Sequence, residues 1–167
     1  MKLVSWALTA GLLSVASPGA AQTLWQNVSY GMSVDEVRRA QPGVEPYESS
    51  DALVTGALCQ LRMIGHREGG ADFNVCFYML DGALQQVTLQ AASPSLELFE
   101  SFFALLRTRY DQAPNNERCP SPSYCSLTWD PRDSEVHVSM VFVQMPRVPV
   151  TLLVNYQKRA AGTGEGS

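Results

Sequence analysis

Four polar residues near the carboxyl end of the chain come closest to a catalytic arrangement. Asp133, Glu135, His137 and Ser139 alternate with other residues, and a strand would place all four on one face. Serine-hydrolase chemistry would need Ser139 as nucleophile and His137 as its base. Side chains along one strand point the same way and cannot approach as a nucleophile and base must. We therefore interpret this set as a solvated strand face and expect no catalytic residue.

Other short motifs of catalysis or cofactor binding are absent from the sequence. It contains no G-x-S-x-G, S-x-x-K or H-E-x-x-H motif, no P-loop and no dinucleotide fingerprint. The second histidine, His66, stands beside a predicted turn, where we expect it to be exposed. We predict a non-enzymatic protein without a metal site or a cofactor.

The four cysteines are expected to form two disulfides. Cys59 and Cys76 lie in two predicted strands joined by the turn sequence REGG, and a turn centred between Arg67 and Glu68 would place them opposite each other. The remaining pair, Cys119 and Cys125, flanks two prolines that can close a small loop. Free reactive thiols are the alternative, and no C-x-x-C redox motif is present.

The amino-terminal segment predicts export. Residues 1–21 combine Lys2, an apolar run and a small-residue end, which is the pattern of a secretory signal peptide with cleavage after Ala21. The apolar run is too short for a membrane anchor. We therefore expect a periplasmic or secreted protein without stable membrane insertion, in a compartment where disulfides persist.

Composition narrows the classes of partner. Without Lys2 the chain has 11 basic residues against 16 acidic ones, a net charge of −5. Nucleic acids and anionic lipids are bound by clustered basic surfaces, so this balance argues against both. We expect no nucleic-acid binding and predict another envelope protein as the partner.

The first predicted helix has an explicit start. Ser33 and Glu36 have the spacing of a capping box, Met32 and Val37 that of a hydrophobic staple, and the sequence QPG marks the end of the helix. A helix this short needs a platform to stabilise it. Residues 52–65, 72–80 and 83–91 have strand-type composition and are predicted to supply that platform.

The second half of the chain repeats the same order of elements. A helix capped by Ser93, with Pro94 in its first turn, is followed by a loop and by strands at 124–130, 135–145 and 148–157. The helix has an apolar stripe at helical spacing, formed by Leu96, Phe99, Phe103, Leu106 and Tyr110. We predict an α+β domain over residues 22–157, with one antiparallel sheet of six to eight strands, two helices on one face and a tandem helix-plus-strands repeat. Residues 158–167 are predicted to be a disordered tail.

The strand at 72–80 carries apolar side chains on both faces. Phe77 and its alternate neighbours fill one face, whereas Cys76, Tyr78 and Leu80 fill the other. The predicted disulfide register adds Leu61 and Met63 to the Cys76 side. Either a long loop covers that side or it is a contact surface. The candidate binding face is therefore formed by Leu61, Met63, Tyr78, Leu80 and Trp129.

The sequence YGMSVDEVRRAQPG and the helix end LLRTRYDQAP resemble a pattern of small exported bacterial proteins. The pattern is similar to that of the fold group of the beta-lactamase inhibitor protein and the small outer-membrane assembly lipoproteins, with Asp111 in place of a glycine. The chain lacks the lipidated cysteine of those lipoproteins. The resemblance implies protein binding through the sheet face or its loops. A small periplasmic hydrolase or a carrier of an apolar ligand is the alternative function.

Overall fold

The computed structural model describes residues 23–132 and 134–160. The predicted signal peptide, Asp133 and tail residues 161–167 lie outside the described residues. Within the described ranges, no helix has both the length and the apolar character needed to cross a membrane. In chain order the elements are β1 Thr23–Trp25, β2 Val28–Ser29, α1 Val34–Ala40, β3 Glu45–Pro46, β4 Leu58–Glu68, β5 Ala71–Leu80, β6 Ala83–Ala91, α2 Leu96–Tyr110, β7 Asn116–Ser121, β8 Tyr124–Trp129, β9 Val136–Val143 and β10 Thr151–Lys158.

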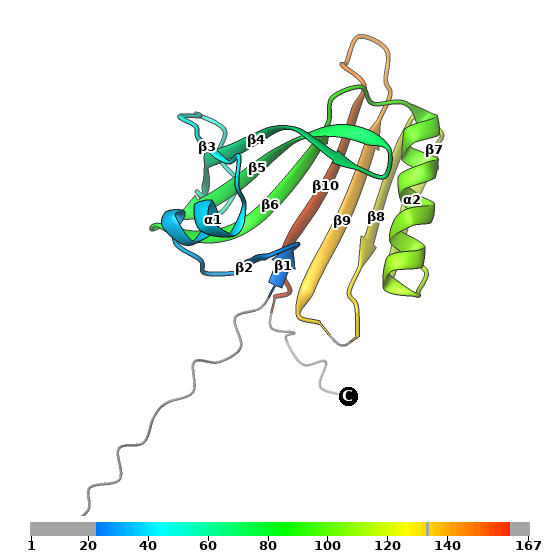
Figure 1. Cartoon of the computed structure of the whole chain (residues 1–167). Coiled ribbons are helices and arrows are strands. Elements are labelled where there is room, and N and C mark those ends of the chain that lie inside the picture. The colour runs from blue at the N-terminus through cyan, green and yellow to red at the C-terminus, as the bar shows by residue number, and fades with distance from the viewer. Residues whose placement is uncertain (1–22, 133, 161–167) are drawn as a thin grey trace, which may run out of the picture.

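Eight strands form one antiparallel sheet in the order β3-β4-β5-β6-β10-β9-β8-β7, and β1 pairs with β2 in a small second sheet (Figure 1). Each helix is thus followed by four strands that pair in sequence order. The two runs of strands meet at the centre of the sheet, where β6 pairs with β10. The predicted α+β class is confirmed, and the eight strands of the large sheet lie within the predicted range of six to eight. The order of elements repeats.

Side-chain caps fix the start of both helices. Glu36 and Ser33 form the predicted capping box of α1, with the Ser33 backbone N–H donating to the Glu36 carboxylate at 2.8 Å. The predicted cap of α2 is wrong by two residues, because Ser95 rather than Ser93 accepts the hydrogen bond from the backbone N–H of Leu98. The helix α2 ends at Asp111 in the left-handed conformation, at φ 46°.

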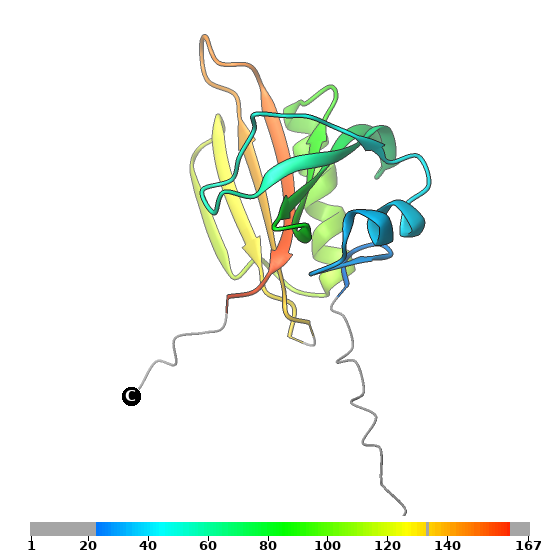
Figure 2. The same ribbon diagram turned by 90° about the vertical axis from the view of Figure 1, so that its left-hand side faces the viewer.

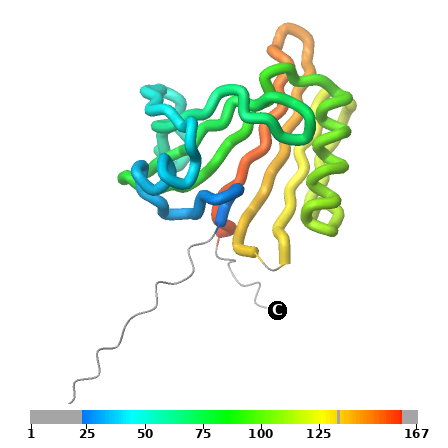
Figure 3. The backbone as a smooth tube through the Cα atoms, viewed as in Figure 1, coloured from blue at the N-terminus to red at the C-terminus, as the bar shows by residue number. Residues whose placement is uncertain are grey.

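Two tight turns build the β4-β5-β6 meander. Asp81 and Gly82, both at positive φ, join β5 to β6 in the predicted hairpin. The β4–β5 turn is formed by Gly69 and Gly70, two residues later than predicted. This turn bends onto α2 (Figure 3). A Cβ atom added at Gly69 would lie 3.2 Å from the Phe102 side chain.

Strand alternation divides the side chains of the large sheet between two faces. We call the face that carries Phe77, Val87, Val154 and Val138 the Phe77 face, and the opposite face the Cys76 face. The Phe77 face holds most of the buried core. Helix α2 covers it through three aromatic contacts, Phe102 with Phe73, Phe99 with Phe142 and Phe103 with Trp129.

Both predicted disulfides are present. Cys59 and Cys76 have a Cα–Cα distance of 5.8 Å, and Cys119 and Cys125 have one of 4.1 Å. The sequence predicted Cys59 and Cys76 to be direct cross-strand neighbours, and this register is wrong. Cys59 faces Tyr78, and a bulge follows at Gln60. The bridge therefore runs diagonally between the two strands.

Several predicted boundaries are wrong. The strand predicted at 52–65 is β4, which begins at Leu58 and runs to Glu68. The segment before Cys125 was expected to be a loop, but β7 pairs there with β8 at the edge of the sheet. All its residues are exposed, so it has no apolar pattern that would predict a strand. At the carboxyl end, Lys158 belongs to β10 and Arg159 donates hydrogen bonds to the carbonyl groups of Pro131 and Ser134.

Candidate functional site

A row of polar side chains crosses the Cys76 face from one edge of the sheet to the other. Each residue is the cross-strand neighbour of the next, and all of the strands contribute one residue. Its centre contains hydroxyl and amide groups, while charged groups stand only at the β3–β4 end. From β3 to β7 this polar row consists of Glu45, Arg62, Cys76, Thr88, Asn155, Ser139, Thr128 and Asn116.

Hydrogen bonds hold the centre of the polar row in place. Thr88 donates to the Asn155 side-chain oxygen at 2.9 Å, and the Asn155 amide donates to the Ser139 hydroxyl at 3.0 Å. The Gln86 amide, one alternate position along β6, donates to the Thr88 hydroxyl at 2.9 Å. These side chains satisfy one another's hydrogen-bonding groups, which restricts their conformations.

The charged end of the polar row opens into a cavity of about 340 Å³, which we call the Arg62 groove. The Arg62 guanidinium lies 4.5 Å from the centre of the Tyr47 ring, a cation–π contact. Its Nε atom is buried and has no hydrogen-bond partner among the described residues. The rest of the lining includes the Cys59–Cys76 disulfide, Asp51, Asn74, Tyr78 and Gln90.

The environment of Tyr78 shows that this groove is partly withdrawn from water. Burial, together with the nearby charge of Asp51 and the neighbouring Tyr47 hydroxyl, raises the pKa of Tyr78 above its ordinary value. The phenol therefore stays protonated at neutral pH and can donate a hydrogen bond. The groove can thus offer donors from a guanidinium, a phenol and two side-chain amides.

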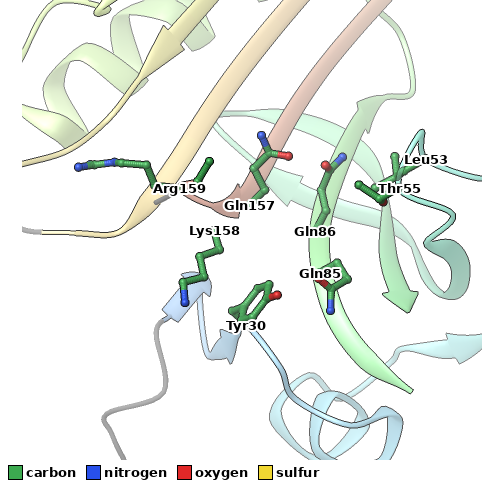
Figure 4. Close-up of a pocket in the computed structure, with 9 residues that line it drawn as sticks. Tyr30, Leu53, Thr55, Gln85, Gln86, Gln157, Lys158 and Arg159 are labelled. Carbon is green, nitrogen blue, oxygen red and sulfur yellow. The ribbon is translucent and has the colours of Figure 1, made fainter. Parts of the chain in front are cut away.

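A second cavity, of about 350 Å³, lies further along β6 and β10 on the same face. Figure 4 shows Leu53 and Thr55 beside Gln86, with Tyr30 and Lys158 completing the surround. The Lys158 ammonium lies 5.2 Å from the centre of the Tyr30 ring. Leu53 and Thr55 belong to segment 47–57, which leaves β3 and returns to β4 (Figure 2). This segment therefore supplies a wall to both cavities.

A separate, partly buried polar cluster lies on the Phe77 face. The Glu68 carboxylate accepts from Arg109 of α2 at 2.6 Å and from the Trp25 indole of β1 at 3.3 Å, and its side chain is 11% exposed. Arg109 also donates to the Tyr156 hydroxyl at 3.4 Å. His66, predicted to be exposed, is half-buried and packs edge-on against Trp25. The cluster joins β1, the β4–β5 hairpin, α2 and β10, and its carboxylate is fully paired. We therefore interpret it as a structural cluster that holds these elements together.

The four polar residues that were interpreted as a solvated strand face do not form a single group in the structure. The His137 Nδ1 atom lies 2.8 Å from the Asp130 carboxylate, whereas Ser139 accepts from Asn155 in the polar row. Glu135 is exposed, and its carboxylate lies 3.9 Å from the Lys158 ammonium. Asp133 lies outside the described residues. Among the residues that the structure describes, no group of three or more His, Cys, Asp or Glu side chains is placed to hold a metal ion.

The five residues of the predicted binding face do not lie on one face of the sheet. Tyr78 and Leu80 lie on the Cys76 face as expected. Leu61 and Met63 do not, because the bulge at Gln60 turns them to the Phe77 face, where Leu61 is 1% exposed. Trp129 is fully buried under α2. These three side chains therefore cannot form an open contact surface.

The bulge at Gln60 also brings to the Cys76 face the residue that sequence reasoning missed. The predicted register, which put Leu61 and Met63 on the Cys76 side, would place Arg62 between them on the opposite, helix-covered side, but Arg62 pairs with Cys76. No sequence signal marks the bulge itself. Tyr47 was missed as well, since its contact with Arg62 spans a loop of irregular structure.

Comparison with known proteins does not assign the chain to a family. No family model matches it, nor does any curated protein or solved structure. The function must therefore be argued from the geometry.

Proposed function

We propose that this chain is an exported protein-binding module and that its Cys76 face receives a partner protein. The proposal places both helices on the Phe77 face. The view in Figure 1, with α1 and α2 both in front of the strands, supports this placement. Both cavities on the Cys76 face are lined by strand and loop residues without a helical one, which also supports it.

The observation that carries the proposal is the polar row. A sheet face of hydroxyl and amide groups with tyrosines at its margin has the composition of adaptable protein-binding surfaces, in which tyrosine supplies contact area and small polar residues supply hydrogen bonds. Charged residues are depleted at the centre of such interfaces, as they are at the centre of this row. The internal hydrogen bonds reduce the ordering cost of binding.

Exposed aliphatic side chains lie in segments that border the Cys76 face. Val54, at the tip of segment 47–57, is fully exposed, and Ile64 at the end of the Arg62 groove is 59% exposed. Met145 and Val148 project from the β9–β10 connection. Such groups can bury apolar area around a polar centre when a partner docks. The alternative of an apolar-ligand carrier is less well supported, because both cavities have several polar lining groups.

Site-specific photo-crosslinking of the exported, oxidised protein in its own cells tests the proposal. A photoreactive residue at Gln90 or Ser126 of the Cys76 face should cross-link one and the same envelope protein, and the same group at Glu100, exposed on α2, should not. Ser126→Arg should abolish the adduct formed from Gln90. Equal adducts from Glu100, or none from either sheet position, would contradict the proposal.

A further inference from the structure

The Arg62 guanidinium has no acceptor within the described part of the chain. It forms no hydrogen bond and no ion pair there, and its Nε atom is both buried and unpartnered. Glu45 is its cross-strand neighbour and Asp51 lines the same groove, yet neither forms an ion pair with it. A buried Nε–H group without an acceptor is unfavourable, and a bound acceptor would relieve that cost.

The surroundings of Arg62 restrict its position and supply further polar groups to the groove. Tyr47 lies against the guanidinium. The Cys59–Cys76 bridge holds the part of β4 before Arg62 against β5. Asn74 and Gln90, which are cross-strand neighbours of each other, line the same groove with side-chain amides. A planar guanidinium held in this way matches a carboxylate, which can accept two parallel N–H bonds.

We propose that the Arg62 groove binds a single carboxylate, carried by an Asp or Glu side chain of the partner protein; this inference rests on the proposed function. Asn74 and Gln90 would bond the peptide groups on either side of that residue. Charge complementarity selects the ligand, because Arg62 is the only cationic residue among the described residues that line the groove. The nearby carboxylates of Glu45 and Asp51 repel further negative charge, so an isolated acidic residue is favoured over an acidic run.

Peptide titration of the oxidised protein, followed by NMR of the arginine Nε–Hε signals and the side-chain amides, tests this directly. The probes are acetyl-Gly-Glu-Gly-amide, its Gln analogue and acetyl-Glu-Glu-Glu-amide. The single-Glu peptide should shift the Arg62, Asn74 and Gln90 signals, with half-saturation in the low millimolar range, and more tightly than the triple-Glu peptide. Equal shifts from the Gln analogue, or no saturable shift at Arg62, would overturn the inference.

Two variants distinguish this inference from the proposed function. Arg62→Gln should remove the response to the single-Glu peptide and reduce partner cross-linking from Ser126 by at least about tenfold, the factor expected for losing a charge-assisted pair. Arg67→Gln, an exposed arginine on the same strand, should change neither. If Arg62→Gln leaves cross-linking intact while Ser126→Arg abolishes it, the carboxylate site is refuted and the protein-binding face stands. If Ser126→Arg also has no effect, the proposed function fails with it.

Discussion

Removing the Glu68 carboxylate should destabilise the protein more than any exposed charge does. The carboxylate accepts from Arg109 at 2.6 Å and from the buried Trp25 indole at 3.3 Å. Glu68→Ala leaves the indole N–H without its acceptor, which costs about 1–3 kcal/mol. It also leaves Arg109 unpaired. Because the Arg109 side chain is 37% exposed, water compensates in part, and this loss falls below the roughly 3–5 kcal/mol of a fully buried pair.

We therefore expect Glu68→Ala to lower the free energy of unfolding by about 2–4 kcal/mol. Glu68→Gln keeps an oxygen acceptor for Trp25 and loses only the charge, so its cost should be about 1 kcal/mol. Urea unfolding of the oxidised protein measures both, with Glu117→Ala on the exposed strand β7 as the matched control. A Glu68→Ala protein as stable as the control, or no difference between the two Glu68 variants, would show that the cluster does not tie the elements together.

Three further predictions concern the disulfides, the C-cap of α2 and the dependence of stability on pH. Replacing the Cys59–Cys76 disulfide by alanines should cost about 3 kcal/mol in urea unfolding and replacing the Cys119–Cys125 disulfide about 2 kcal/mol, because the first closes the longer loop. Asp111→Gly should stabilise by about 1 kcal/mol, since glycine adopts the left-handed conformation without strain, whereas a destabilised variant would contradict the cap assignment. Burial raises the pKa of Tyr156, so the protonated phenol contributes fully to the free energy of unfolding below about pH 10, and this contribution is lost as the pH rises further. The free energy of unfolding should therefore fall more steeply above about pH 10 in the wild type than in Tyr156→Phe.

Local patterns predicted the elements that have strong local signals. The capping box at Ser33 and Glu36 and the hairpin at Asp81 and Gly82 depend on residues close together in sequence. Strand-type composition likewise located β5, β6 and β9. The edge strand β7 lacks this signal, because exposed polar residues on both faces give the same pattern as a loop.

The candidate site was less predictable because it depends on register. One extra residue at Gln60 reverses the faces of the side chains that follow it as far as Met63, where a second irregularity begins, and this moved Leu61 into the core and Arg62 to the Cys76 face. The cluster around Glu68 was missed for a different reason. Its partners Trp25 and Arg109 are each more than 40 residues away in sequence, so no local pattern joins them.

The Cys59–Cys76 disulfide has a consequence beyond stability. It joins β4 to β5 on the amino-terminal side of the bulge, and Arg62 follows on the other side, paired with Cys76 itself. A one-residue slip of β4 would turn Arg62 towards the Phe77 face, where its guanidinium would be buried among apolar side chains. The bridge restricts such a slip at the point where the bulge would otherwise make it easiest. The position of Arg62 in the polar row is therefore a property of the oxidised protein.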